Sequence, residues 1–197
     1  MHLRPRLRAL GVIACVLALA VLTGCGEATP TGGGSQGSGE GEAHREGLAI
    51  PFEGVEYNVL ITRQLNVMDA EDRGYLIGNE PGPGYAAYGV FLEACNRGDE
   101  PKAATSTFRI VDSQDNTYEP RVLEDENVFS YEAHELQAGQ CIPETGSLAD
   151  SAPTSGALMV FDLPLAAVEN RPLELEIEQG FDLEAGAPKT EHIELDI

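Results

Sequence analysis

Apolar and acidic residues alternate one by one near the end of this chain. Residues 173–178 read Leu-Glu-Leu-Glu-Ile-Glu, and residues 193–197 repeat the pattern as Ile-Glu-Leu-Asp-Ile. A period of two places successive side chains on opposite faces of an extended strand. The pattern therefore predicts two strands with one buried face and one acidic, solvated face. The glutamates of residues 173–178 are expected to protect this strand against edge pairing and to discourage anionic partners.

Four further runs rich in β-branched and aromatic residues are bounded by Gly, Pro, Asn or Asp, and they predict strands over residues 57–62, 88–92, 107–111 and 157–161. The sequence Asp-Ser-Gln-Asp-Asn at 112–116 is typical of a tight hairpin turn. No helical segments alternate with these strands. Residues 48–197 are therefore predicted to form one all-β domain, an antiparallel β-sandwich.

The start of the chain has a different pattern. Three arginines and no acid occur in residues 2–8, and residues 10–22 are uncharged and mostly apolar. A positively charged segment followed by a short apolar run is typical of a signal peptide. A membrane-spanning helix needs about 20 apolar residues, so this run is too short for a permanent span. We interpret residues 1–24 as a lipoprotein signal peptide.

The residue that follows is Cys25, at the end of the sequence Leu-Thr-Gly-Cys. These four residues resemble the lipobox of bacterial lipoproteins. The resemblance implies that the Cys25 thiol receives a diacylglycerol and that cleavage makes Cys25 the mature N-terminus. Membrane lipid would then hold the protein at the extracytoplasmic face of the cell membrane. The alternative is a secreted protein, cleaved nearby, in which Cys25 is free.

Residues 26–47 are rich in Gly, Ser, Thr and Glu and contain no large apolar side chain. Such a segment cannot bury enough surface to offset the entropy of ordering. Residues 25–47 are therefore predicted to be the lipidated cysteine and a disordered tether. By random-coil scaling the tether would span roughly 25 Å.

The chain is strongly acidic, with 33 Asp and Glu against 12 Lys and Arg. Loss of the signal peptide removes three arginines and no acid, which leaves 9 basic residues and a formal net charge of −24. Nucleic-acid binding requires clustered basic side chains. We therefore expect no nucleic-acid partner, and we expect a monomer whose partner is a protein or another envelope component.

Only two cysteines, Cys95 and Cys141, lie in the predicted domain. Export to an oxidising compartment permits a disulfide, and two cysteines can pair in only one way. Closing a loop of this length would stabilise the fold by roughly 4 kcal/mol in the chain-entropy model. The alternative is two free thiols.

Several motifs together resemble one family. They are YGVFLEACN, FRIVDSQDNTYEP, FSYEAHELQAGQCIPETG, SGALMVFDLP and RPLELEI. In this combination they look like the telokin-like, immunoglobulin-fold domain of unknown function found in bacterial lipoproteins and secreted proteins, the immunoprotective extracellular protein type. The resemblance covers roughly residues 52–197 and implies an immunoglobulin-like antiparallel β-sandwich with no established catalytic residues. Residues 124–140 have no counterpart in the pattern.

Candidate chemistry is sparse. His134 and His192 are the domain's two histidines, and neither has the spacing of a zinc motif. The acidic clusters at 68–72 and 112–116 lack the order of a calcium loop. We expect the two acidic clusters to form turns and loops. We also expect the domain to have no resident metal or cofactor and no enzyme activity.

Three hypotheses follow for the function. The first is a non-catalytic module that binds a partner through loops or a sheet edge. The second is a calcium-linked binding module that uses the acidic loops. The third is a hydrolase that depends on a pair of carboxylates.

Overall fold

The computed structural model describes residues 43–77, 80–124 and 126–197, which belong to one compact unit. The predictions for the signal peptide, for Cys25 and for residues 26–42 lie outside the described residues. Within the described residues no helix is long and apolar enough to cross a bilayer.

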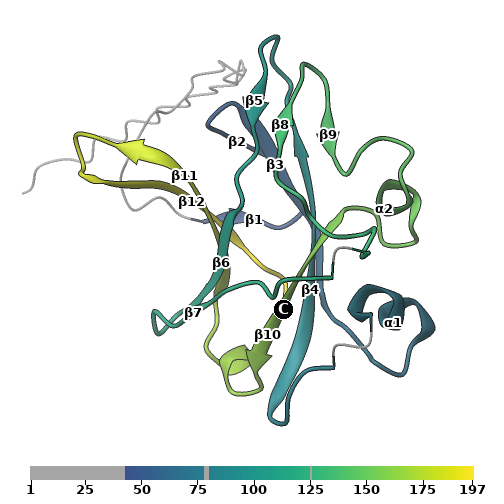
Figure 1. The fold of residues 1–197 in the computed structure, drawn as a ribbon. Helices are drawn as coiled ribbons and strands as arrows, with labels where there is room; N and C mark the ends of the chain where they lie inside the picture. Colours follow the sequence, from purple (N-terminus) through teal and green to yellow (C-terminus); the bar gives the residue numbers. More distant parts are fainter. Residues whose placement is uncertain (1–42, 78–79, 125) are drawn as a thin grey trace, which may run out of the picture. The chain divides into compact units, whose positions relative to one another are not determined.

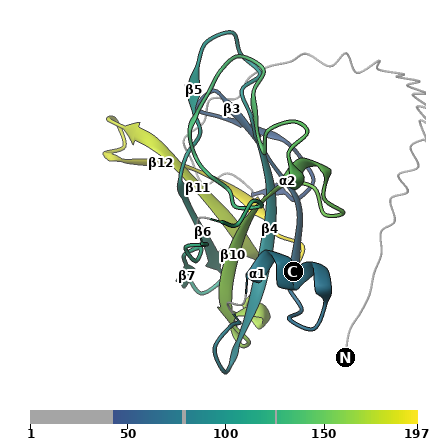
Figure 2. The same cartoon turned by 45° about the vertical axis from the view of Figure 1, so that its right-hand side comes forward.

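Two five-stranded sheets form the domain (Figures 1 and 2). The first sheet has the order β1 (His44–Arg45), β12 (Ala187–Glu194), β11 (Leu173–Asp182), β6 (Thr107–Asp112) and β7 (Thr117–Tyr118). The second has the order β10 (Ala157–Pro164), β4 (Tyr85–Cys95), β3 (Val55–Gln64) and β2 (Ile50–Phe52), with β9 (Cys141–Ile142) also paired to β4. A separate two-stranded sheet contains β5 (Lys102–Ala103) and β8 (Glu135–Leu136).

The main core lies between the two large sheets. The first sheet contributes the apolar positions of its alternating strands, such as Leu175 and Ile177 on β11, which are fully buried. The second contributes Val90 and Leu92 of β4 from the opposite side. The prediction of an all-β sandwich is therefore confirmed. The β1–β12 pair is parallel, whereas the remaining named pairs are antiparallel.

A smaller core cluster covers the outer face of the second sheet. Helix α1 (Ala70–Leu76) packs Tyr75 and Leu76 against Phe91 of β4. The Tyr75 ring contacts the ring of Phe91 edge to face, with centroids 5.3 Å apart. The acidic cluster at 68–72 thus belongs largely to a helix and its cap, where the sequence had predicted a loop. Two short helical turns, α2 (Leu148–Ser151) and η1 (Ala167–Glu169), complete the fold.

Asp69 caps the N-terminus of α1. Its Oδ1 accepts hydrogen bonds from the backbone N–H groups of Glu71 and Asp72, at 2.8 and 3.3 Å. Replacement of Asp69 by Ala is expected to lower the free energy of unfolding by about 1 kcal/mol, because two helix N–H groups lose their acceptor. Urea unfolding would measure the change. Met68→Ala is the matched control, since the neighbouring Met68 side chain is 83% exposed; an equal loss in both variants would contradict a capping role.

The ordered domain begins before Leu48. Strand β1 lies in the segment assigned to the tether, and it pairs His44 with Ile193 of β12. The carboxylate of Glu46 accepts hydrogen bonds from the N–H of Thr62 in β3 and from the N–H of Asp196, so it links the two sheets. At the other end β12 runs from Ala187 to Glu194, so only the first two residues of the strand predicted over 193–197 lie in it.

The position of β11 corrects one inference from the alternating pattern. Strand β11 lies between β12 and β6 rather than at a sheet edge. Its outward-facing glutamates therefore protect no edge of the sheet. They pair across the strands with basic side chains instead.

Candidate functional site

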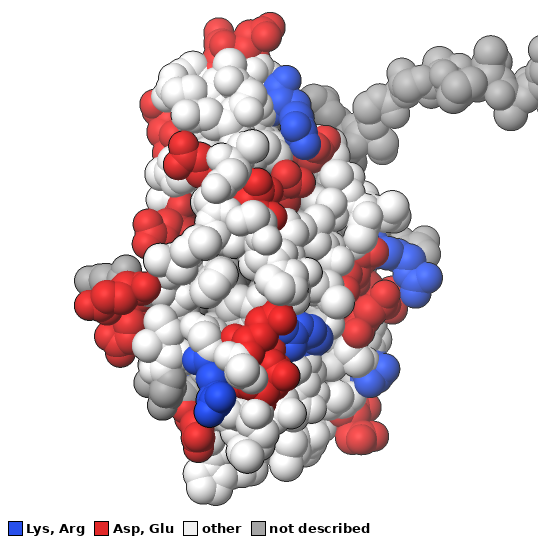
Figure 3. Space-filling model, turned by 90° about the vertical axis from the view of Figure 1, so that its right-hand side faces the viewer, with Lys and Arg blue, Asp and Glu red and all other residues white. Residues whose placement is uncertain are grey.

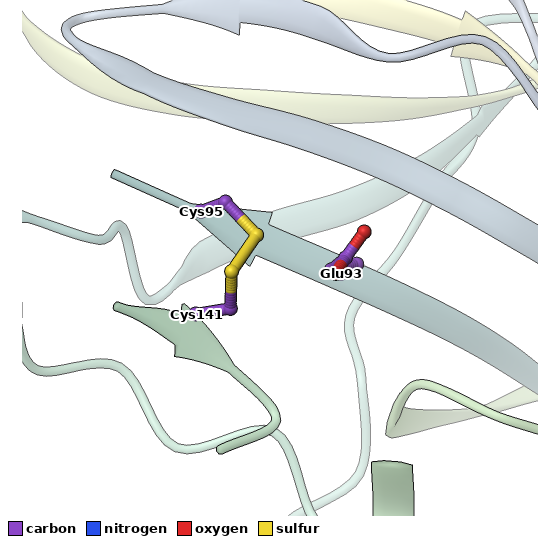
Figure 4. Close-up of side chains that lie close together, drawn as sticks. All are labelled: Glu93, Cys95 and Cys141. Atoms are coloured by element: carbon purple, nitrogen blue, oxygen red, sulfur yellow. A yellow bond between two sulfur atoms is a disulfide. The ribbon is translucent and has the colours of Figure 1, made fainter. Parts of the chain in front are cut away.

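The predicted disulfide between Cys95 and Cys141 is present. It joins β4 to β9 at a directly paired position, with a Cα–Cα distance of 4.1 Å (Figure 4). Glu93 lies two residues earlier on β4, and its carboxylate is within 4.8 Å of both sulfur atoms. Because the sulfurs are bonded to each other, these three residues do not form a metal site in this state. The disulfide between Cys95 and Cys141 therefore has a structural role.

The turn after β6 is built around the buried carboxylate of Asp112. Its oxygens accept hydrogen bonds from the backbone N–H groups of Gln114 and Asn116 and from the side chains of Asn116, Tyr118 and Asn170. Burial alone would raise the pKa of Asp112, but these hydrogen bonds outweigh it and hold the pKa well below its usual range. The acidic cluster at 112–116 is thus a turn organised by N–H and O–H donors.

The glutamates of β11 form a charged ladder on the outer face of the first sheet. Arg109 of β6 pairs with Glu176 and Glu178, and His192 of β12 lies 3.1 Å from Glu174. Each glutamate thus faces a basic side chain on a neighbouring strand. Arg109 and Glu176 lie directly opposite each other, and opposite charges at such a position stabilise a sheet. The ladder accounts for His192 without a ligand-binding role.

His134 is exposed in the chain before β8. Its Nδ1 lies 2.9 Å from the carbonyl oxygen of Glu132. The structure does not bring His134 and His192 together into one metal cluster among the residues it describes.

Arg63 of β3 ties α1 to the second sheet. Its guanidinium lies 2.7 Å from the buried carboxylate of Asp72 and stacks over the rings of Tyr75 and Phe91. Burial opposes ionisation of Asp72, but the hydrogen bonds from Arg63 and from the N–H of Asn66 lower its pKa. Each of these polar groups has a structural partner, so this cluster positions the helix.

An open groove of about 280 Å³ lies where the chain crosses from β7 toward β10. It is lined by the segments 120–124 and 130–133, by Ser106 and Phe108 from the first sheet, and by Leu158 and Met159 of β10. Phe108 and Met159 of the main core and Leu158 of the smaller cluster lie buried at its apolar base. The segment between β7 and β8, to which the sequence had assigned no role, therefore forms one wall of the groove.

The polar groups of this groove suit recognition. Exposed carboxylates of Glu124 and Glu132 lie on its rim, and Arg121 pairs with Asp162. The Tyr131 hydroxyl donates to the carbonyl oxygen of Thr105 at 2.9 Å, and burial raises the pKa of Tyr131 far above its usual value. A neutral phenol that already donates is a poor general base. Among the described residues that line the groove there is no histidine or cysteine.

Acidic side chains also predominate on the face of the molecule shown in Figure 3, where Lys and Arg are few. This agrees with the composition of the whole chain, which has 33 acidic and 12 basic residues. Such a surface attracts cationic partners and repels anionic ones.

The fold defines the class of protein as an all-β sandwich domain. No protein-family model matches the chain, and no curated protein matches it. Among solved structures it is similar to the YjhA protein of Bacillus subtilis, with 11% identity, a TM-score of 0.50, and coverage of 78% of this chain and 99% of that one. At this identity the likeness shows the fold alone.

Two further bacterial structures are similar at lower scores. The YcdA protein of Bacillus subtilis, described as a candidate lipoprotein, is 10% identical, with a TM-score of 0.45 and coverage of 77% of this chain and 39% of that one. A conserved hypothetical protein of Bacillus anthracis is 14% identical, with a TM-score of 0.45 and coverage of 67% and 87%.

Proposed function

We propose that this protein is a lipid-anchored, extracytoplasmic lipoprotein whose sandwich, of the telokin-like immunoglobulin type, binds a partner without catalysing a reaction. The observation that supports binding is the groove beside β6, which combines an apolar floor with a charged rim. The anchor rests on the Leu-Thr-Gly-Cys sequence that ends at Cys25. We propose a monomer that has no cofactor and binds no nucleic acid.

The chemistry of the described polar clusters supports binding over catalysis. A catalytic site needs an acid, base, nucleophile or metal held near the reacting atom. The carboxylates of Asp112 and Asp72 are occupied by hydrogen-bond donors, and Tyr131 donates to a carbonyl. Each of these groups already serves the fold.

The calcium-linked alternative gains no support from the acidic loops. Calcium requires several oxygen ligands directed at one point. The oxygens of Asp112 accept from N–H and O–H donors, and Oδ1 of Asp69 accepts from the first turn of α1. A shift of the melting temperature with added calcium, absent with magnesium, would favour the calcium alternative.

Capture from envelope extract tests the binding function. The mature chain carrying Cys25→Ala would be immobilised, and bound proteins identified after crosslinking. A saturable partner that soluble mature chain displaces supports the proposal. The hydrolase hypothesis replaces it if the protein turns over an ester, peptide or glycoside and the substitution of one carboxylate abolishes that turnover.

Lipidation predicts a clear difference between two cysteine variants. Labelled fatty acid is expected to enter the wild-type protein and Cys15→Ala, but not Cys25→Ala, because only Cys25 follows the lipobox sequence. Two acyl chains suffice for stable membrane attachment, so Cys25→Ala should also leave the membrane fraction. Gel autoradiography and fractionation measure both effects. Equal labelling of all three proteins would exclude Cys25 as the anchor.

A further inference from the structure

The hairpin formed by β11 and β12 extends beyond the rest of the first sheet (Figures 1 and 2). Strand β6 pairs with β11 only as far as Glu178, and β1 pairs with β12 only at Ile193 and Glu194. Residues 181–188, which we call the hairpin tip, therefore have no neighbouring strand outside the hairpin among the described residues. The outer part of the hairpin is a two-stranded projection.

Contacts with segments outside the hairpin hold its base in place. The ammonium group of Lys189 lies 2.7 Å from a carboxylate oxygen of Glu53, which is in the turn between β2 and β3. The side chain of Gln179 donates to the carbonyl oxygen of Ala103 at 2.7 Å and accepts from the hydroxyl of Tyr57 at 3.1 Å. The direction of the projection is therefore fixed by contacts on both of its strands.

The hairpin tip exposes apolar side chains at a turn, where polar residues are more common. Phe181 is 54% exposed and Leu183 is 88% exposed. The turn that presents Leu183 is ordered, because Oδ1 of Asp182 accepts hydrogen bonds from the N–H groups of Glu184 and Ala185 at 2.8 and 3.0 Å. The other exposed apolar residues of the tip are Ala185, Ala187 and Pro188. Exposed apolar residues that are grouped rather than scattered are typical of an interaction site.

The chain enters the domain beside this hairpin. Strand β1 is parallel to β12, with His44 opposite Ile193. Strand β12 begins at Ala187, next to the turn of the hairpin, and runs toward the core. Because parallel strands run in the same direction, the N-terminal end of β1 is the end nearer the tip. The distance along β12 from Ile193 back to Ala187 is about 20 Å at the rise of an extended strand.

This geometry brings the tip within reach of a membrane to which Cys25 is attached. By random-coil scaling residues 26–43 would span roughly 20 to 25 Å. That span is similar to the distance between the start of β1 and the tip. The effective concentration of a tethered site is greatest when the length of the tether matches the distance it must cover. A bilayer at the anchor is therefore the surface that the tip meets most often.

The charge of the tip determines which kind of bilayer it can contact. The charged residues within 181–188 are Asp182 and Glu184, and the whole chain is strongly acidic. An anionic headgroup layer would repel such a surface, whereas a zwitterionic layer would not. The attraction must therefore come from apolar side chains. Phe181 and Leu183 offer less apolar surface than one acyl chain, which by itself gives only marginal membrane binding, so the tip needs the tether.

We propose that the hairpin tip inserts Phe181 and Leu183 into the headgroup region of the membrane that anchors the chain. This contact determines the orientation of the sandwich on the membrane. It forms only when the chain is tethered, and it is strongest on zwitterionic lipid. The inference rests on the proposed lipid anchor and adds a second, weaker membrane contact to it.

The test uses an artificial anchor. In the mature chain, made without lipid, Cys25 is the only cysteine outside the disulfide, so it can be coupled to vesicles that contain a maleimide lipid. The chain has no tryptophan, so Leu183→Trp supplies one fluorophore at the tip. Vesicles of dibrominated phosphatidylcholine quench tryptophan only on close contact. Coupled Leu183→Trp should be quenched, whereas coupled Val122→Trp should not, because Val122 is 95% exposed but lies outside the hairpin.

Further variants test the source of the attraction. In the Leu183→Trp background, Phe181→Ser should lower the quenching about threefold, because apolar surface is lost, and Phe181→Leu should retain most of it. Uncoupled Leu183→Trp should show little quenching. Replacing part of the phosphatidylcholine by phosphatidylglycerol should reduce the quenching, and added salt should restore it by screening. Melting temperatures of all variants should stay within a few degrees of wild type.

Three results would overturn the proposal. The first is equal quenching of coupled Leu183→Trp and coupled Val122→Trp. The second is equal quenching with Ser and with Leu at position 181, and the third is stronger quenching on anionic lipid. A protein partner is the other possible occupant of the tip. If Phe181→Ser/Leu183→Ser loses a partner that the parent chain captures from detergent-solubilised envelope, the tip binds a protein and the membrane assignment is wrong.

Fatty-acid labelling separates this inference from the proposed anchor. If the wild-type protein is labelled but the coupled tip variant is not quenched, the lipid anchor stands and the tip contact is rejected. If the coupled tip variant is quenched but Cys25 receives no fatty acid in cells, the native anchor is rejected, and the affinity of the tip for a nearby bilayer stands.

Discussion

Replacing Cys95 and Cys141 together by Ala is expected to lower the free energy of unfolding by about 4 kcal/mol, because the crosslink restricts the unfolded chain. The two cysteines are separated by 46 residues, so the closed loop is long. For a domain of this size the loss corresponds to a melting temperature lower by roughly 8 to 16 °C. The variant should remain folded at 25 °C if the parent has a typical stability of about 5 to 15 kcal/mol.

Calorimetry with and without a dithiol reductant measures the effect. Reductant should lower the melting temperature of the wild-type protein toward that of the double variant and leave the double variant unchanged. An unchanged wild-type melting temperature after complete reduction, verified by thiol titration, would show that the crosslink contributes little.

Asp112→Ala is expected to lower the free energy of unfolding by about 3 kcal/mol, since several donors in partly buried hydrogen bonds lose a charged acceptor at once. Asp112 joins the β6–β7 hairpin to Asn170, which precedes β11, so the effect reaches beyond one turn. The matched control is Asp115→Asn in the same turn. Asp115 is exposed with φ of 60°, a conformation that Asn tolerates well, and the control should change little. Urea unfolding at pH 7 compares the variants, and equal losses would contradict the central role of Asp112.

The same carboxylate predicts a dependence on pH. The pKa of Asp112 in the folded state is lowered below the unfolded value of about 4. Its contribution to stability is therefore complete at neutral pH and is lost as pH falls below about 4 toward the folded pKa. In Asp112→Asn the free energy of unfolding should depend less on pH between pH 5 and about 2.5 than it does in wild type. Part of the pH dependence should remain in this variant, because the pKa of Asp72 is also lowered in the folded state. Identical slopes in wild type and Asp112→Asn would refute the assignment.

The all-β architecture could be predicted because each strand carries its own signal. Leu173, Leu175 and Ile177 occupy alternate positions, and the structure buries all three on one face of β11. The turn at 112–116 could be predicted for the same reason, since Asp and Asn determine the local backbone through short-range hydrogen bonds. The disulfide could be predicted from the number of cysteines in the domain and from the oxidising compartment that the signal peptide implies.

Helix α1 could not be predicted from its own sequence. It has 7 residues, too few for a clear helical period, and it is held by Arg63, Phe91 and the Asp69 cap. Most of the stability of so short a helix comes from tertiary packing. The sequence of 68–72 showed the acidic residues but could not show the surface on which the helix packs.

The sequence by itself determined the long strands β3, β4, β6, β10 and β11, the buried face of β11, the hairpin turn and the only cysteine pair available to the domain, because these follow from side-chain period, turn chemistry and counting. Tertiary structure alone decided that β11 is a central strand, that β1 extends the first sheet into the predicted tether, and that β7 pairs with β6 only at Ile110 and Val111. Strand order and edge coverage depend on contacts between residues far apart in the chain. A local pattern carries no information about which strand will lie beside it, so the groove became visible only when the sheets were assembled.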